Sequence, residues 1–192
     1  MSPVTCNESL TSSTEPVYPR YEGDTVVRWE DAMQVDCLIE VIEAARKSWE
    51  YVLGLVPADS MERPDPHGGW TVKDHIAHIA WHEDQMVQLI EAKALVGSPW
   101  WELPTDERNE HIHEQYKDKS FQEIQSIAED SYLRMMAALA TLEDADLNES
   151  KRFENMPEDW IPWTLIAGNT YEHYLEHQIG IRRMLRNPKW EA

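Results

Sequence analysis

Apolar side chains recur at steps of three and four residues in four long stretches of the chain, which is the spacing of one face of an α-helix. The pattern predicts helices over about residues 31–56, 71–96 and 120–142, and a fourth from about residue 163 to residue 186. A short additional helix is expected to start at Thr105. No stretch shows the alternating pattern of a strand, so the sequence predicts an all-α protein.

Two local sequences mark where helices begin. Thr71-Val-Lys-Asp74 and Ser120-Phe-Gln-Glu123 each place a hydroxyl three residues before a carboxylate, which is the form of a capping box. The connection over residues 97–119 is much longer than the few residues that join an antiparallel hairpin. The helices on either side of it can therefore run parallel, and we expect an up-down-down-up four-helix bundle.

The N-terminal segment differs in composition from the rest of the chain. Residues 1–28 are rich in Ser, Thr and Pro and show no sustained period, so we expect a flexible N-terminal arm there. Residues 29–192 are expected to form one bundle domain, because a chain of 192 residues can bury an ordinary hydrophobic core.

The composition narrows the range of partners. With 36 acidic and 17 basic residues the formal charge is −19, whereas nucleic-acid binding requires clustered Lys and Arg. We therefore expect neither a nucleic-acid nor a membrane partner. No signal peptide is evident, and no apolar run is long enough to span a bilayer. Two cysteines are too few for a disulfide framework or a thiolate zinc site, and the expected location is the cytoplasm.

Histidines form the main chemical signal. His173 and His177 lie four residues apart on the apolar side of the last predicted helix, which places them about 6 Å apart on one surface. Three neutral imidazoles with an open position are typical of a catalytic metal site. The second predicted helix offers His75, His78 and His82, and the spacing alone does not say which of them reaches the ion. A four-histidine or two-metal site is conceivable, although no carboxylates are placed to balance a second ion.

The run from His173 to His177 also has the form H-x-x-E-H, the inverted zincin pattern. That pattern requires a carboxylate further along the chain, and the only acid after His177 is Glu191. We therefore disfavour a peptidase. Glu176 stays a candidate for moving a proton, with a plain helix-surface carboxylate as the alternative interpretation.

Two motifs carry a family resemblance. The segment Gly69-Trp-Thr-Val-Lys-Asp-His-Ile-Ala-His-Ile-Ala80 resembles the W-S-x-K-D/E-x-x-x-H-I/L signature of the DinB/YfiT-like superfamily. The segment Asn169-Thr-Tyr-Glu-His-Tyr-Leu-Glu-His177, followed by Ile181-Arg182, is most similar to the ClbS/DfsB branch. The resemblance covers about residues 31–187 and implies an up-down-down-up four-helix bundle with a three-histidine metal site.

By position, the metal ligands that the resemblance implies are His78, His173 and His177. His75 stands where family members usually have an apolar residue, and we expect it to orient a ligand or a bound water. Relatives include thiol-dependent transferases and isomerases, hydrolases, and ClbS-like self-resistance proteins that open a strained electrophilic ring of a genotoxic metabolite. The ClbS branch need not use a metal.

These residues favour a metal-dependent hydrolase or thiol transferase. A divalent cation, Zn, Ni, Fe or Mn, would activate water or a thiol against a small electrophilic molecule, in detoxification or self-resistance. Glu176 and His75 are the candidates for proton movement. Four tryptophans in the two long loops are expected to line the substrate pocket: Trp100, Trp101, Trp160 and Trp163.

Two alternatives stay open. A non-catalytic protein could sequester a small reactive compound in the tryptophan-lined pocket, without turnover and without a metal. A homodimer in which the histidines only pack is the third interpretation.

Overall fold

The computed structural model describes residues 32–65 and 69–187, so the predicted arm over residues 1–28 lies outside the described residues. Within the described ranges the protein is all-α, as predicted, and its only β-type pairing is an isolated parallel bridge between Ala94 and Glu154. The α-helices are α1 (Val35–Gly54), α2 (Val72–Ala92), α3 (Thr105–Tyr116), α4 (Phe121–Leu139), α5 (Asp144–Asn148), α6 (Pro162–Gly168) and α7 (Tyr171–Leu185). In the same described ranges, three short 3-10 turns lie between them: η3 (Ala58–Ser60), η4 (Pro99–Glu102) and η5 (Ser150–Arg152).

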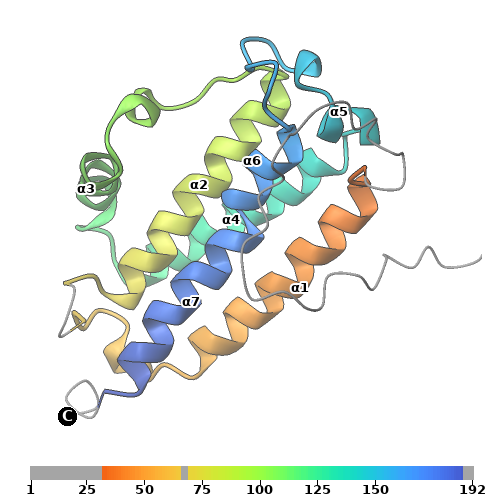
Figure 1. Cartoon of the computed structure of the whole chain (residues 1–192). Coiled ribbons are helices and arrows are strands. Elements are labelled where there is room, and N and C mark those ends of the chain that lie inside the picture. The colour runs from red at the N-terminus through yellow and green to blue at the C-terminus, as the bar shows by residue number, and fades with distance from the viewer. Residues whose placement is uncertain (1–31, 66–68, 188–192) are drawn as a thin grey trace, which may run out of the picture. The chain divides into compact units, whose positions relative to one another are not determined.

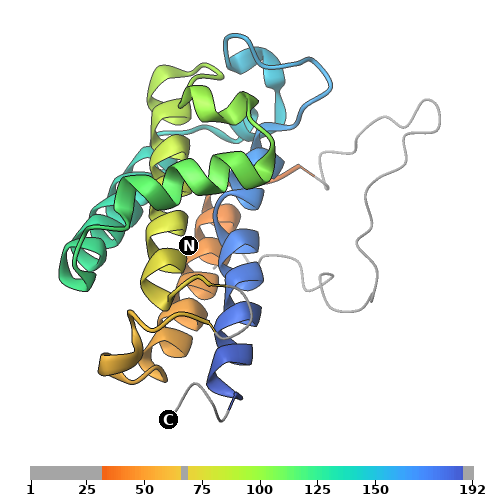
Figure 2. The same cartoon turned by 90° about the vertical axis from the view of Figure 1, so that its left-hand side faces the viewer.

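The four long helices α1, α2, α4 and α7 form the predicted bundle. In Figure 1, α1 and α7 run in one direction and α2 and α4 in the other, which is the up-down-down-up order. Helix α2 packs against α4, and α1 packs against α7. The long connection between α2 and α4 contains α3, which lies across the bundle beside α2 (Figure 2). None of the described helices is both long and apolar enough to cross a membrane.

The predicted capping boxes start α2 and α4. The Thr71 hydroxyl accepts a hydrogen bond from the Asp74 amide, and the Asp74 carboxylate accepts one from the Thr71 amide at 2.8 Å. Ser120 and Glu123 form the same reciprocal pair at the start of α4. Each box satisfies amides that the first helical turn would otherwise leave without partners, so the sequence fixes these two starting points locally.

The prediction of one continuous fourth helix is wrong, because the helix is interrupted between α6 and α7. Asn169 ends α6, and Thr170 has φ −130° and ψ −103°, outside the helical region. The Thr170 hydroxyl donates to the carbonyl of Ile166, and the Asn169 amide donates to the carbonyl of Leu165. Side chains therefore satisfy the carbonyls that end α6, and the Asn169 oxygen is left to bond a residue of α2.

A buried carboxylate joins all four bundle helices. Glu83 of α2 is 0% exposed and accepts hydrogen bonds from Arg46 of α1 at 3.2 Å, from Ser131 of α4 at 2.6 Å and from the Tyr174 hydroxyl of α7. Burial raises the pKa of Glu83, and the Arg46 charge opposes that rise. Because each helix contributes one group to a single carboxylate, the network fixes how far α7 is shifted along α2.

Candidate metal centre

Five histidines gather where α2 faces α7. His75, His78 and His82 come from α2, and His173 and His177 come from α7. The contacting rings lie with their centroids 4.4 to 4.9 Å apart. His78, His82 and His173 are nearly inaccessible to solvent, with 4%, 5% and 8% of their surface exposed. The helical spacing within each element and the register between the two elements together produce the cluster.

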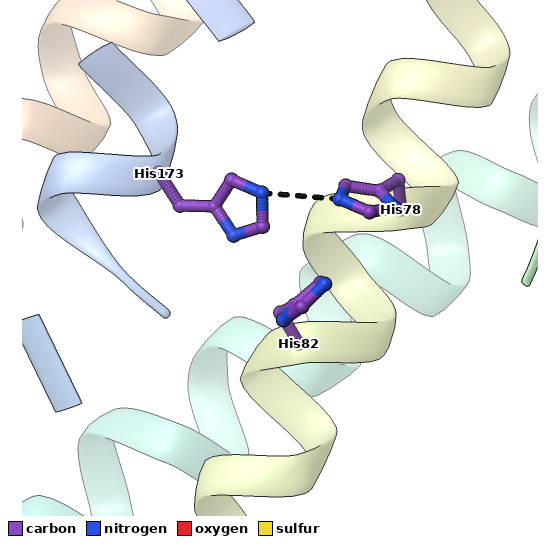
Figure 3. Close-up of side chains that lie close together, drawn as sticks. All are labelled: His78, His82 and His173. Carbon is purple, nitrogen blue, oxygen red and sulfur yellow. Dashed lines mark hydrogen bonds between the residues drawn. The ribbon is translucent and has the colours of Figure 1, made fainter. Parts of the chain in front are cut away.

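Three of the five rings converge as a set of metal ligands would. His78, His82 and His173 each offer a nitrogen, and these nitrogens lie within 4.8 Å of one another (Figure 3). The closest pair is His78 Nε2 and His173 Nε2, at 3.1 Å. Two nitrogens about 2.0–2.1 Å from one ion are separated by about 2.9 to 3.4 Å for angles between a right angle and a tetrahedral angle. The observed spacing therefore suits two ligands of one ion, and it equally suits a hydrogen bond between the rings.

Asn169 fixes the orientation of His82. Its amide nitrogen donates to the carbonyl of Leu165 at 2.7 Å, so its oxygen is the atom 2.7 Å from His82 Nδ1. An amide oxygen only accepts hydrogen bonds, so Nδ1 of His82 carries the proton and Nε2 presents a lone pair. That Nε2 is buried and has no hydrogen-bond partner among the described residues. A histidine held through one nitrogen with the other left free is the usual arrangement of a metal ligand.

His177 lies beside this group and is held by His75. Their Nδ1 atoms are 2.7 Å apart, so one ring donates a hydrogen bond to the other. The His177 ring also lies 4.7 Å from His173 and 4.9 Å from His78, measured between centroids. If Nδ1 of His177 donates to His75, then Nε2 of His177 keeps a lone pair that can bind the same ion. His75 would then orient a metal ligand, which is the role expected for it. Glu176, between the two α7 histidines, is exposed and lines the cavity described below.

The cluster is electrically neutral at neutral pH. Burial is the largest cause in every case: it lowers the pKa of His75 to about 4, of His82 and His173 to about 3, and of His177 to about 2. The pKa of His78 is lowered even further, by burial and then by the neighbouring rings of His82 and His173. Neutral imidazoles keep a lone pair on each ring, which is the form that binds a cation.

A cavity of about 540 Å³ opens onto the histidines. The five rings form part of its wall, and residues of α3 and the segment before α2 form other parts. Trp101 lines this cavity, whereas Trp100, Trp160 and Trp163 are not part of its lining. Trp160 is 43% exposed, Trp163 packs against the hydrophobic core, and Trp100 stacks on Trp81 at 6.0 Å. For these three tryptophans a role in a substrate pocket stays a prediction.

Several lining residues were not among the sequence candidates for the site. Trp70 lies 5.1 Å from the His78 ring and stacks 6.3 Å from His177, and it is the tryptophan of the family signature. Asn169 stands in the second motif, but no sequence pattern assigns it a partner. Arg108 lies in an acidic stretch that is typical of a solvent-exposed helix, so the sequence gives no signal of its place in the cavity.

The sequence profile of the DinB superfamily matches residues 42–180. The chain belongs to the DinB superfamily. No curated protein sequence matches it significantly. Among solved structures, the Sibling Lethal Factor Precursor DfsB is 16% identical, with a TM-score of 0.65 over 81% of this chain and 97% of that one.

Two further structures resemble the chain. The colibactin self-resistance protein ClbS, in complex with a double-stranded DNA, is 11% identical with a TM-score of 0.66 over 80% of this chain and 96% of its own. A mycothiol-dependent maleylpyruvate isomerase is 16% identical with a TM-score of 0.57 over 77% of this chain and 60% of its own. The DNA in the ClbS structure does not fit our expectation of no nucleic-acid partner. At these identities the likeness shows a shared fold, so for this chain that expectation stays a prediction.

Proposed function

We propose that this protein is a metal-dependent enzyme that acts on a small electrophilic molecule, with a divalent cation held by imidazoles of α2 and α7. The observation that carries this proposal is the convergence of His78, His82 and His173, whose ligand nitrogens lie within 4.8 Å of one another. A cation bound there would supply Lewis acidity and lower the pKa of water or a thiol. An all-imidazole donor set suits Zn, Ni, Fe or Mn better than Mg or Ca.

The ligand set has two versions that share His78 and His173. The geometry favours His82 as the third ligand, because Asn169 orients it and its Nε2 is buried with no partner in the described part of the chain. The family resemblance favours His177, whose ring lies between those of His173 and His75.

The chain's own residues supply the rest of the site. Trp70 and Trp101 give the cavity two aromatic surfaces for the apolar part of a ligand, and about 540 Å³ is room for a small molecule. Glu176 is exposed on the cavity wall, where its carboxylate can take a proton from an attacking water or thiol. His75 holds His177 through their Nδ1 atoms.

Two proteins of similar structure support parts of this proposal, one the nucleophile and the other the biological role. The isomerase that depends on mycothiol supports a thiol as the nucleophile. ClbS is a self-resistance protein, which supports a role in detoxification or self-resistance. The competing candidate function is sequestration of a small molecule without turnover. Trp70 and Trp101 in the cavity wall favour it, since an apolar ligand can bind to aromatic surfaces without a cation. The homodimer and the cytoplasmic location stay predictions.

Metal analysis of protein purified without a histidine tag tests the proposal. We expect a stoichiometric transition metal or, after chelation, one zinc bound per chain in a competition titration. His78→Ala and His173→Ala should each abolish tight binding, whereas His111→Ala, which removes an exposed histidine on α3, should leave it unchanged.

The pair His82→Ala and His177→Ala then identifies the third ligand, because only the variant that loses a ligand should weaken zinc binding by a factor of about ten or more. The proposal is wrong if the wild-type protein binds zinc no more tightly than the His78→Ala/His173→Ala double variant. A metal-free protein that still binds an apolar electrophile would instead support sequestration.

A further inference from the structure

Arg108 carries an unneutralised positive charge into the cavity. It lies on α3 and lines the same cavity as the histidine cluster. Arg46, Arg134 and Arg152 each pair with at least one carboxylate. Among the described residues, no ion pair includes Arg108, and its buried Nε has no hydrogen-bond partner. Arg182, Arg183 and Arg186 also have no ion pair among the described residues, but these side chains are exposed, whereas Arg108 is half-buried.

An aromatic ring holds the guanidinium in place of an acid. The central carbon of Arg108 lies 5.2 Å from the ring centre of Trp101, within the range of a cation–π contact. Trp101 in turn lies 5.4 Å from Trp81 and 5.5 Å from the ring of His82. Gly97 permits this position, because a Cβ there would lie 2.7 Å from the indole nitrogen of Trp101. Stacking uses the face of a guanidinium and leaves its N–H groups free to donate hydrogen bonds in the plane of the guanidinium.

The surroundings of Arg108 suit a singly charged anion. The cluster contributes no negative charge, and the Arg108 charge is among the causes that lower the pKa of His82 and His173. Thr105 and Asn109, on the same helix, also line the cavity and add neutral hydrogen-bonding groups. The other charged groups of the cavity lining are the carboxylates of Asp65 and Glu176, so one guanidinium matches at most the single charge of a carboxylate. A phosphate monoester, with a charge near −2, requires more than one such donor.

We propose that Arg108 binds a carboxylate of the substrate, so that the enzyme acts on a small organic carboxylate whose reacting part faces the imidazoles. The planar fork of a guanidinium matches the two oxygens of a carboxylate. The assignment of a reacting part rests on the proposed function, but the assignment of the anion site does not. Arg108 is therefore a substrate-binding residue that α3, packed beside α2, places in the wall of the cavity.

Calorimetric titration of the full-length, chelator-treated protein tests this site without a metal. The probes are benzoate, its neutral analogue benzamide, and phenyl phosphate. We expect measurable benzoate binding that weakens about tenfold or more in Arg108→Gln, because a charge-assisted contact is lost. Arg108→Lys should recover part of the affinity, since it keeps the charge without the fork. Arg183→Gln, which removes an exposed arginine of α7, is the matched control and should bind like the wild type.

Three results would overturn the carboxylate site: no benzoate binding to the wild type, equal benzoate affinity in Arg108→Gln, or benzamide binding as tight as benzoate. Tighter binding of phenyl phosphate than of benzoate would overturn the choice of carboxylate. The thermal midpoint of Arg108→Gln shows whether the variant is folded. Zinc binding by the same variant should equal that of the wild type, so failure of the cation site and failure of the anion site are separate results.

Discussion

Acid should destabilise the metal-free protein well above the pH at which carboxylates titrate. In the unfolded chain a histidine has its ordinary pKa of about 6.5. In the folded chain burial lowers the pKa of all five cluster histidines: to about 4 for His75, about 3 for His82 and His173, about 2 for His177, and further for His78. Between these values the unfolded chain binds protons that the folded chain excludes. The contribution of these neutral histidines to the free energy of unfolding is therefore fully present above pH 6.5, and it is lost as the pH falls from 6.5 towards 3.

The magnitude follows from the difference in proton binding. At pH 5.5 a histidine with an unfolded pKa of about 6.5 favours the unfolded state by about 1.4 kcal/mol if its folded form stays neutral. The five histidines of the cluster, each with a folded pKa well below 5.5, then contribute about 7 kcal/mol in all. A domain of this size has a total stability of about 5–15 kcal/mol, so this loss is a large fraction of it.

Urea unfolding followed by tryptophan fluorescence, in the presence of chelator at pH 7.0, 6.0 and 5.5, measures this loss. His82→Gln should remove about a fifth of the pH-dependent part of the free energy of unfolding, whatever its effect on stability at pH 7. His111→Gln, at an exposed position outside the cluster, should leave the pH dependence unchanged. A free energy of unfolding that stays constant from pH 7.0 to 5.5 would refute the reasoning, as would a His82→Gln variant with the full wild-type loss.

Three further substitutions test the elements that support the site. Tyr174→Phe removes a hydrogen bond to the Glu83 carboxylate and should cost about 1.5–3 kcal/mol in urea unfolding; a loss below 0.5 kcal/mol would contradict the bridging role of that carboxylate. Gly97→Ala places a methyl group 2.7 Å from the Trp101 nitrogen and should cost about 1–3 kcal/mol, with a changed tryptophan emission spectrum. Asn169→Ala removes the acceptor that orients one imidazole and should weaken zinc binding about 10- to 100-fold in a competition titration, and an unchanged affinity would exclude that role.

The bundle could be predicted because its signals are local. The capping boxes at Thr71 and Ser120 satisfy amides within one helical turn, and the apolar period continues along each long helix. The break at Asn169 could not be predicted in this way. Its side chain is satisfied by a residue of α2 that is 87 positions away in the sequence, so the contact that stabilises the break is absent from any local window.

The candidate site was predictable only in part, for the same physical reason. His173 and His177 share one surface because they lie four residues apart, and a local pattern contains that fact. Arg108 lies on a helix with one buried residue, Ile112, and its place in the cavity depends on how the long connection crosses α2. Trp70 was visible as part of the family signature, but its contact with the cluster depends on the path of the chain before α2.

The cluster is difficult to explain as packing alone. Nδ1 of His78, Nε2 of His82 and Nδ1 of His173 are buried without hydrogen-bond partners in the described structure. Leaving a buried polar group unsatisfied costs about 1–3 kcal/mol, so apolar side chains of similar size would stabilise the bundle more than these three rings do. The Glu83 network shows that this fold can satisfy a buried polar group completely when stability is at stake. Of these three nitrogens, Nε2 of His82 is the one that the proposed cation would satisfy, because the ion would bind His78 and His173 through their Nε2 atoms. That unsatisfied lone pair beside the cavity is therefore better understood as a ligand that awaits a cation than as packing.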